Sequence, residues 1–100
     1  MIARIWNGWT TPENAPRYEE LFKKVVLPKV TQGVSGYKGT NLLKREDGKE
    51  IEFTTIFWFE SIEAVKSFAG ENFERAVVPE QVRALMSRYE ETVHHHEVAL

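Results

Sequence analysis

Hydrophobic residues are most concentrated between Glu50 and Gly70, where a predicted strand leads directly into a predicted helix. Residues 51 to 59 are β-branched or aromatic almost throughout, which is typical of a strand buried on both faces. Ser61 follows as an N-cap, apolar residues recur at helical spacing from 62 to 69, and Gly70 ends the helix. One layer of helices covers only one face of a sheet, so the pattern predicts that a second copy of the chain covers the other.

The remaining segments alternate between strand-like and helix-like patterns. The helix that follows the first strand starts either with Thr11 as cap and Pro12 at the first helical position, or with a capping box of Thr10 and Glu13. We expect Pro28 to end or kink this helix. Asp47-Gly48 predicts a tight hairpin turn. The predicted strands cover residues 2–9, 37–45, 50–60 and 88–98, and the predicted helices cover residues 12–27, 61–70 and 79–87.

This order of elements predicts an α+β fold of the ferredoxin-like βαββαβ type. A four-stranded antiparallel sheet would carry both main helices on one face, in a single domain that spans residues 1–100. The open face would expose apolar side chains from several strands, and such a patch is seldom left in water. The pattern therefore predicts a homodimer in which two open faces stack across a two-fold axis and close an α+β barrel.

Composition excludes several classes of function. The chain has 13 Lys and Arg against 15 Asp and Glu, for a net charge of −2, so nothing indicates a nucleic-acid partner. It has no cysteine, which excludes disulfides, thiolate metal sites and cysteine nucleophiles. No apolar run is long enough to span a membrane and no signal-peptide pattern is present, so we expect no membrane partner and a cytoplasmic location. Motifs of serine hydrolases, zinc proteases and nucleotide-binding loops are absent.

Three stretches of the sequence resemble small proteins of the antibiotic biosynthesis monooxygenase superfamily. They are MIARIWNGWTTPENAPRYEEL at the start, FTTIFWFESIEAVKSFAGENFERAVVPE in the middle and HHHEV near the end, with FWFESIEAVKSFAG the most specific part. The resemblance implies the dimeric α+β barrel fold. It also implies a buried pocket between sheet and helices, where Trp, Asn, Tyr and Arg side chains position a polycyclic phenol that reacts directly with oxygen.

The resemblance thus predicts a monooxygenase that needs no cofactor and oxidises a small aromatic or polycyclic phenol. Two alternatives stay open, because the superfamily also contains haem-degrading enzymes and members without a known reaction. The first is a non-catalytic dimeric barrel that binds a small hydrophobic ligand. The second is a haem-binding or haem-degrading relative, in which a histidine would bind iron.

The three consecutive histidines offer the most visible chemistry. Neighbouring residues of a strand point to opposite faces, so His95 is expected to lie opposite His94 and His96. His94 and His96 on one face could bind a metal ion, but only two ligands converge there, and we predict no metal site. The three could equally be exposed or dimer-contact residues. His95 is the predicted acid/base residue, since a neutral imidazole suits removal of a phenolic or carbon-bound proton.

The other candidate residues are aromatic or amide side chains on the predicted strands and helices. Trp58 is expected to share a sheet face with Thr54 and Ile56, opposite Phe53, Phe57 and Phe59. A structural role in the core or interface competes with a ligand role for each aromatic and each buried amide. Arg4 and Arg88 are expected to pair with carboxylates on a neighbouring strand. The predicted catalytic residues are His95, Trp58 and Asn7, and the predicted substrate-binding residues are Trp6, Tyr37, Asn41, Phe68, Phe73 and Met86.

Overall fold

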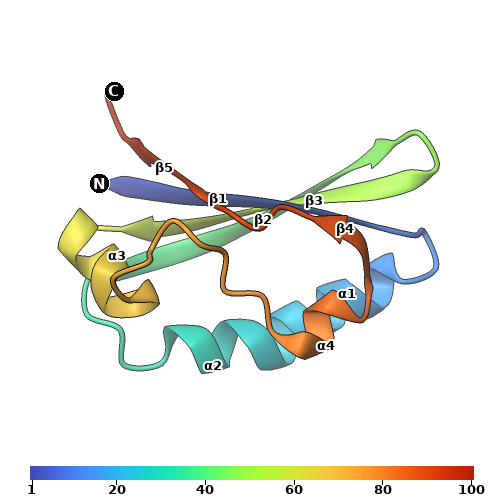
Figure 1. The fold of residues 1–100 in the computed structure, drawn as a ribbon, viewed down its shortest axis with the longest axis horizontal. Helices are drawn as coiled ribbons and strands as arrows, with labels where there is room; N and C mark the ends of the chain where they lie inside the picture. Colours follow the sequence, from blue (N-terminus) through green and yellow to red (C-terminus); the bar gives the residue numbers. More distant parts are fainter.

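The computed structural model describes all residues from 1 to 100, which form one antiparallel sheet with helices on one side (Figure 1). No helix is long and apolar enough to cross a membrane. The strands are β1 (Ile2–Thr10), β2 (Tyr37–Asp47), β3 (Glu50–Phe59), β4 (Met86–Tyr89) and β5 (His94–Glu97). The helices are α1 (Ala15–Leu21), the π-helical turn η1 (Phe22–Val26), α2 (Leu27–Thr31), α3 (Ile62–Ala69) and α4 (Glu80–Arg83).

The sheet has the order β2-β3-β1-β4, and β5 also pairs with β1. All pairings are antiparallel, with β1 in register against β3 from Ile2 opposite Phe59 to Thr10 opposite Ile51. The α1–η1–α2 helix and the shorter α3 both lie under the same face of the sheet, while the other face is open (Figure 1). The predicted ferredoxin-like arrangement is confirmed.

The last strand differs from its prediction as one continuous strand over residues 88–98. It is interrupted, because residues 91–93 pair with the segment before α4 and bulge out of line. The Ala76 amide donates to the Glu91 carbonyl at 2.8 Å, and the Val93 amide donates to the Glu74 carbonyl at 2.8 Å. The helix predicted over residues 79–87 is correspondingly short, and Met86 begins β4 instead.

The first long helix also differs from its prediction, since Pro28 does not end it. The Leu27 amide bonds to the carbonyl of Phe22, five residues back, and the chain stays helical to Thr31. This π-type turn lies immediately before Pro28, where the proline ring removes one amide donor from the ladder. The helix starts at Ala15 with Asn14 at its N-cap position, so neither predicted start, with Pro12 or Glu13 inside the helix, is correct. The Thr11 hydroxyl does accept from the Asn14 amide at 3.1 Å, in the turn before the helix.

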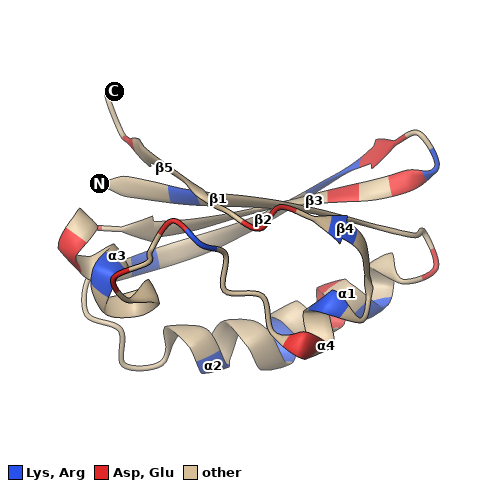
Figure 2. Ribbon diagram, in the orientation of Figure 1, with Lys and Arg blue, Asp and Glu red and all other residues tan.

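The core lies between the sheet and the helices in two clusters. The larger one joins Tyr18 and Phe22 of the long helix to Phe53 of β3, with the Tyr18 and Phe53 rings meeting edge to face at 4.7 Å. The smaller one joins Phe59 to Val65 of α3. Charged residues of both signs are spread along the helices and strands, and neither sign gathers over one element (Figure 2).

Candidate functional site

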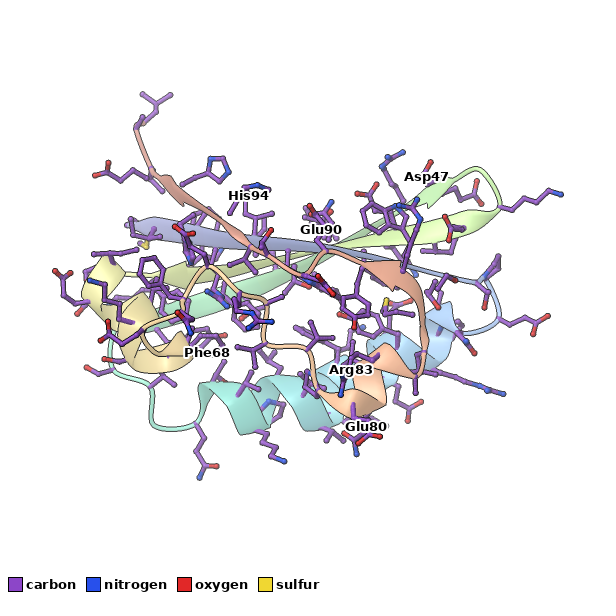
Figure 3. The ribbon with its side chains drawn as sticks, viewed as in Figure 1. Asp47, Phe68, Glu80, Arg83, Glu90 and His94 are labelled. Atoms are coloured by element: carbon purple, nitrogen blue, oxygen red, sulfur yellow. The ribbon has the colours of Figure 1, made fainter.

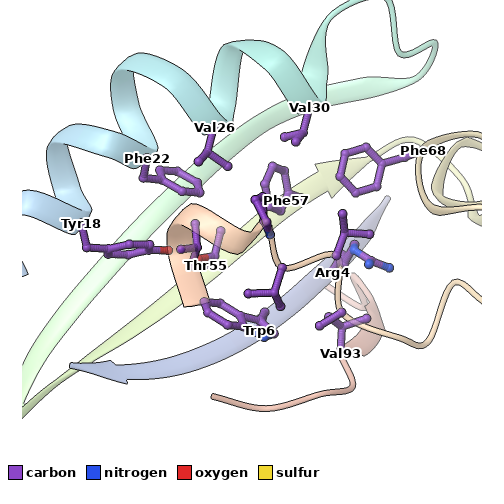
Figure 4. A pocket seen from close by; sticks show the side chains of 15 residues that line it. Arg4, Trp6, Tyr18, Phe22, Val26, Val30, Thr55, Phe57, Phe68 and Val93 are labelled. Atoms are coloured by element: carbon purple, nitrogen blue, oxygen red, sulfur yellow. The ribbon is translucent and has the colours of Figure 1, made fainter. Parts of the chain in front are cut away.

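A small apolar cavity lies between the helix-facing side of the sheet and the long helix (Figure 4). β1 and β3 form its floor, α1, η1 and α2 form one wall, and α3 closes one end. The irregular segment of residues 70–79, the covering segment, closes it from the remaining side, where Ala76 to Pro79 line the cavity. Its lining comprises Arg4, Trp6, Tyr18, Phe22, Val26, Val30, Thr55, Phe57, Phe68, Ala76, Val77, Val78, Pro79, Val82 and Val93. Twelve of these 15 residues are hydrophobic.

The cavity is too narrow for a flat aromatic ligand in this conformation. Its volume is about 50 Å³, whereas pockets for drug-sized ligands usually enclose about 300–1,000 Å³. The covering segment has little regular structure. Backbone hydrogen bonds attach it to residues 91–93, from the Ala76 amide to the Glu91 carbonyl and from the Val93 amide to the Glu74 carbonyl, and Arg75 forms an isolated bridge with Thr92. Residues 70–79 belong to none of the five strands of the sheet.

Arg4 is the only charged side chain in the cavity lining, and it has no carboxylate partner. The residue is 3% exposed, and its guanidinium donates to the Phe73 carbonyl through Nη1 and to the Arg75 carbonyl through Nη2 at 3.1 Å. Burial lowers the pKa of Arg4 to about 10, which still leaves it charged at neutral pH. The expected pairing with a carboxylate is therefore wrong for Arg4, whereas Arg88 does pair with Glu50 at 3.1 Å.

Two hydroxyl groups lie side by side in the middle of the cavity. Burial raises the pKa of Tyr18 to about 12, against a smaller opposing effect of the neighbouring Thr55 hydroxyl, so the Tyr18 hydroxyl is protonated and can donate a hydrogen bond. The Tyr18 hydroxyl points toward Thr55 from across the cavity (Figure 4). Thr55 is 2% exposed, and its Oγ1 is buried without a hydrogen-bond partner. A buried polar atom left unpaired is costly, which makes Thr55 a plausible contact for a polar atom of a ligand.

The histidines are divided between the two faces of the sheet, as strand alternation predicts. His94 pairs with Ile5 and His96 with Ala3, and His94 projects from the open face, while Phe68 lies on the helix side (Figure 3). His95 pairs with Arg4 and points to the helix side. No group of three or more His, Cys, Asp or Glu side chains has an arrangement that could hold a metal ion.

His95 lies behind Arg4 and does not line the cavity itself. Its Nε2 is 3.1 Å from Nη1 of Arg4, and its ring meets the Phe73 ring edge to face at 5.4 Å. Burial lowers the pKa of His95, and the positive charge of Arg4 lowers it further against an opposing effect of Glu74. The imidazole is therefore neutral at pH 7 and its Nε2 accepts from Arg4.

The structure brings two of the predicted substrate-binding residues into the cavity lining, Trp6 and Phe68. The other helix-facing candidates lie outside it. Phe73 meets Arg4 through its carbonyl, Tyr37 packs against Phe59 and hydrogen-bonds to Thr40, and Met86 packs against the larger core cluster.

The remaining candidates lie on the open face, away from the cavity. Trp58 donates to the Asn41 side-chain carbonyl at 2.7 Å, and Asn7 donates to the Glu52 carboxylate. Register places Trp58 with Ile56 and Thr54 and opposite Phe57, so the predicted division of faces is confirmed. Within one chain, the sheet itself separates Trp58, Asn7 and Asn41 from the cavity.

Sequence reasoning missed Arg4, Tyr18 and Thr55 as cavity residues. Arg4, Trp6 and Thr10 alternate along β1 and so point to the same face of the sheet. Thr55 likewise points to the same face as Phe53 and Phe57 on β3. The sequence did contain a signal for two of these residues. Alternation along the strands places the polar side chains of Arg4 and Thr55 on the face that carries the aromatic residues.

No protein-family model matches the sequence, and no curated protein matches it. Among solved structures, two of MhuD match all of this chain at 23% identity. The heme-degrader MhuD (Rv3592) from Mycobacterium tuberculosis with two hemes bound in its active site has a TM-score of 0.63 and 97% of its chain covered. An MhuD variant with two manganese protoporphyrin IX molecules per active site has a TM-score of 0.66 and 96% covered.

Two further solved structures match 99% of this chain, each with 93% of its own chain covered and a TM-score of 0.56. One is Rv0793 from Mycobacterium tuberculosis, at 20% identity. The other is a candidate antibiotic biosynthesis monooxygenase from Chloroflexus aurantiacus J-10-fl, at 14% identity. Identities this low establish the fold and no more. The chain therefore has the α+β fold of MhuD, Rv0793 and this candidate monooxygenase, consistent with the resemblance to the antibiotic biosynthesis monooxygenase superfamily seen in its sequence.

Proposed function

We propose that this protein is a monooxygenase that binds a small aromatic phenol in the cavity between sheet and helices and oxidises it without a cofactor. The observation that carries the proposal is the cavity itself, an apolar space that holds a few buried polar groups: Arg4, Tyr18 and the unpaired Oγ1 of Thr55. Apolar walls with a small number of placed polar groups are the usual composition of a small-molecule site.

The cavity residues would act by holding the substrate and stabilising its oxyanion. In the overall reaction a CH₂ group of an anthrone-type phenol becomes a carbonyl, one atom of O₂ enters the product and the other leaves as water. Loss of a proton from the substrate places negative charge on its oxygen, and the Tyr18 hydroxyl can donate to that oxygen. The hydrophobic lining excludes water, which strengthens this interaction and protects reactive intermediates.

Of the three predicted catalytic residues, we propose that His95 takes part in the reaction. Its neutral imidazole lies on the cavity side of the sheet, next to Arg4, so it could take up a proton when the covering segment is displaced. Trp58 and Asn7 stay predictions, since their side chains lie on the opposite face. Trp6 and Phe68 would contact the ring system of the ligand.

Haem binding is an alternative because the MhuD structures contain hemes or a porphyrin analogue. The cavity residues do not fit a haem. Its lining holds no His, Cys or Met, and the one side chain of a known iron-ligand type, Tyr18, has its pKa raised by burial. The histidines all lie on β5, and His95 is engaged with Arg4. We therefore derive no step that involves haem.

We further propose that the open sheet face is the contact surface of a homodimer. Apolar side chains gather there beside the Trp58–Asn41 pair, and Leu43 is 51% exposed in the single chain. Register places Ile5, Ile56 and Leu43 on this face, which no helix covers (Figure 1). Stacking two such faces would bury these side chains and yield the dimeric barrel.

Oxygen uptake with an anthrone-type phenol tests the proposed activity, with no added metal, flavin or haem. Uptake above the rate of spontaneous oxidation, together with a quinone product, supports the monooxygenase. A trace no faster than the spontaneous rate, with tight binding of the same compound, would favour the alternative of a non-catalytic barrel that binds a hydrophobic ligand. A haem titration separates the remaining alternative, because haem bound by a protein side chain gives a Soret band.

A further inference from the structure

The Arg4 guanidinium is unusual because it is a buried cation with no acidic partner. No Asp or Glu oxygen lies within 4.0 Å of it, whereas six other basic side chains form ion pairs with carboxylates elsewhere in the chain. Burying an unpaired charge costs considerable free energy, so a structural role alone would be served better by an apolar residue. Its partners are two backbone carbonyls, the His95 imidazole and the Phe68 ring, whose centroid lies 5.4 Å from the guanidinium carbon, and none of them neutralises its charge.

The hydrogen bonds of Arg4 leave part of its donor capacity free. A guanidinium has five N–H donors. One on Nη1 bonds to the Phe73 carbonyl, the other on Nη1 faces His95 Nε2, and one on Nη2 bonds to the Arg75 carbonyl. The remaining donors are one on Nη2 and the one on Nε, and these two nitrogens share one edge of the guanidinium. Two adjacent donors match the two oxygens of a carboxylate.

The second end of the site is marked by Thr55. Trp6 is directly opposite Thr55 and Arg4 directly opposite Phe57, so Arg4 and Thr55 are diagonal neighbours on adjacent strands. Diagonal neighbours lie about 7–8 Å apart, which is comparable with the length of two fused aromatic rings. A ligand that spans this distance would place one polar group at Arg4 and another at Thr55 and Tyr18, with its rings against Trp6, Phe57 and Phe68.

We propose that Arg4 is the carboxylate-binding residue of the cavity, and that the ligand is a flat aromatic carboxylic acid. This inference rests on the proposed function and narrows its substrate class to phenols that also carry a carboxylate. The carboxylate binds the guanidinium edge that the protein leaves free, while the phenolic or carbonyl oxygen at the other end of the ring system contacts the hydroxyls of Tyr18 and Thr55.

Arg4 also connects the proposed ligand site to the covering segment. The same guanidinium binds the carbonyls of Phe73 and Arg75, and both residues belong to that segment. Because the carboxylate binds the free edge, these two bonds can persist when the ligand is bound. Only the residues that line the cavity have to move to enlarge it beyond about 50 Å³.

Calorimetric binding of two isosteric probe pairs tests the inference at neutral pH. The pairs are 2-naphthoate with 2-naphthamide and anthracene-2-carboxylate with anthracene-2-carboxamide. We expect the wild-type protein to bind each carboxylate about tenfold or more tightly than its amide, because a hydrogen-bonded charge pair exceeds a neutral one by at least that factor. Arg4→Gln should reduce this preference to about twofold or less, and Arg4→Lys should retain part of it.

Arg75→Gln is the matched control, since Arg75 is an exposed cation two residues from Phe73, and it should keep the full preference. Equal affinity of the wild-type protein for acid and amide would overturn the carboxylate site while leaving the cavity as an aromatic site. Loss of the preference in Arg75→Gln to the same extent would also overturn it. No binding of any of the four probes would contradict the proposed aromatic site as well. The wild-type comparison decides the question even where Arg4→Gln does not fold.

Discussion

The guanidinium of Arg4 and the imidazole of His95 lie side by side on paired strands, with Nη1 3.1 Å from Nε2. A guanidinium has no acceptor, so the imidazole nitrogen accepts and the second ring nitrogen carries the proton. The pair therefore holds His95 neutral and holds Arg4 against the covering segment, whose carbonyls at Phe73 and Arg75 it also binds. One contact links the strand β5, the floor of the cavity and its cover.

The stability of the fold should fall in mild acid because of His95. Its pKa is lowered in the folded state, chiefly by burial and then by the charge of Arg4, whereas Glu74 opposes the shift and His94 and His96 add to it. A lowered folded-state pKa means that the unfolded chain binds the proton more tightly. The stabilising contribution is therefore full above the ordinary value of 6.5 and is lost as the pH falls through the folded-state pKa.

Urea unfolding at pH 7.5 and pH 5 measures this effect. The wild-type free energy of unfolding should drop between these two pH values, and His95→Gln should show a smaller drop. His96→Gln is the control, since His96 lies on the open face opposite Ala3, and it should behave as the wild type does. The same pH dependence in wild type and His95→Gln would contradict the assignment.

Thr55→Val should stabilise the protein and weaken ligand binding. The Oγ1 of Thr55 is buried without a partner, so an isosteric methyl group removes an unpaired polar atom and gains about 1 kcal/mol. Thr10→Val is the matched control, because the Thr10 hydroxyl, also fully buried, donates to the Leu85 carbonyl and its loss should cost about 1 kcal/mol. Denaturant midpoints measure both variants. Destabilisation of Thr55→Val by as much as Thr10→Val would show that Thr55 has a partner in solution.

The cover of the cavity should open far more often than the sheet. Residues 70–79 are attached mainly through the Ala76 and Val93 amides and through Arg4, whereas β1 is paired along its whole length with β3. Hydrogen exchange monitored by mass spectrometry or NMR should therefore show the Ala76 and Val93 amides exchanging well before those of β1 and β3. Exchange of all these amides at one common rate would mean that the cover opens only when the whole domain unfolds.

Leu43→Glu should prevent formation of the proposed homodimer. Leu43 is 51% exposed on the open face, and a buried carboxylate without a partner disfavours an interface. Val25→Glu is the control, since Val25 is similarly exposed but belongs to the long helix on the other side. Sedimentation equilibrium should give twice the chain mass for wild type and Val25→Glu and the chain mass for Leu43→Glu. A wild-type mass equal to one chain would refute the dimer.

The faces of the strands could be predicted from the sequence because their period is local. Alternation placed Phe53, Phe57 and Phe59 together and Thr54, Ile56 and Trp58 on the other side, and the register agrees. The hairpin turn was equally local, since Gly48 adopts a positive φ of 63° there. The resemblance to the superfamily then predicted how these strands and helices are arranged in one fold.

The details that failed depend on contacts between distant parts of the chain. The break between β4 and β5 follows from bonds of residues 91–93 to residues 74–76, which no local pattern announces. Arg4 was expected to meet a carboxylate on a neighbouring strand, but it meets backbone carbonyls of the segment around residue 74. The cavity lies on the face of the sheet that the helices cover, and strand alternation alone does not tell which face that is. Trp58 points to the other face and so lies away from the cavity.

If an aromatic substrate is oxidised inside the cavity, a variant whose side chain fills the cavity should lose the reaction. Val30 lines the cavity from α2, whereas Val25 is exposed on the same long helix and does not line it. Oxygen uptake with an anthrone-type phenol should exceed the spontaneous rate for the wild type and for Val25→Trp, and should fall to the spontaneous rate for Val30→Trp. Uptake by Val30→Trp equal to that of the wild type, or no uptake by the wild type, would contradict the account.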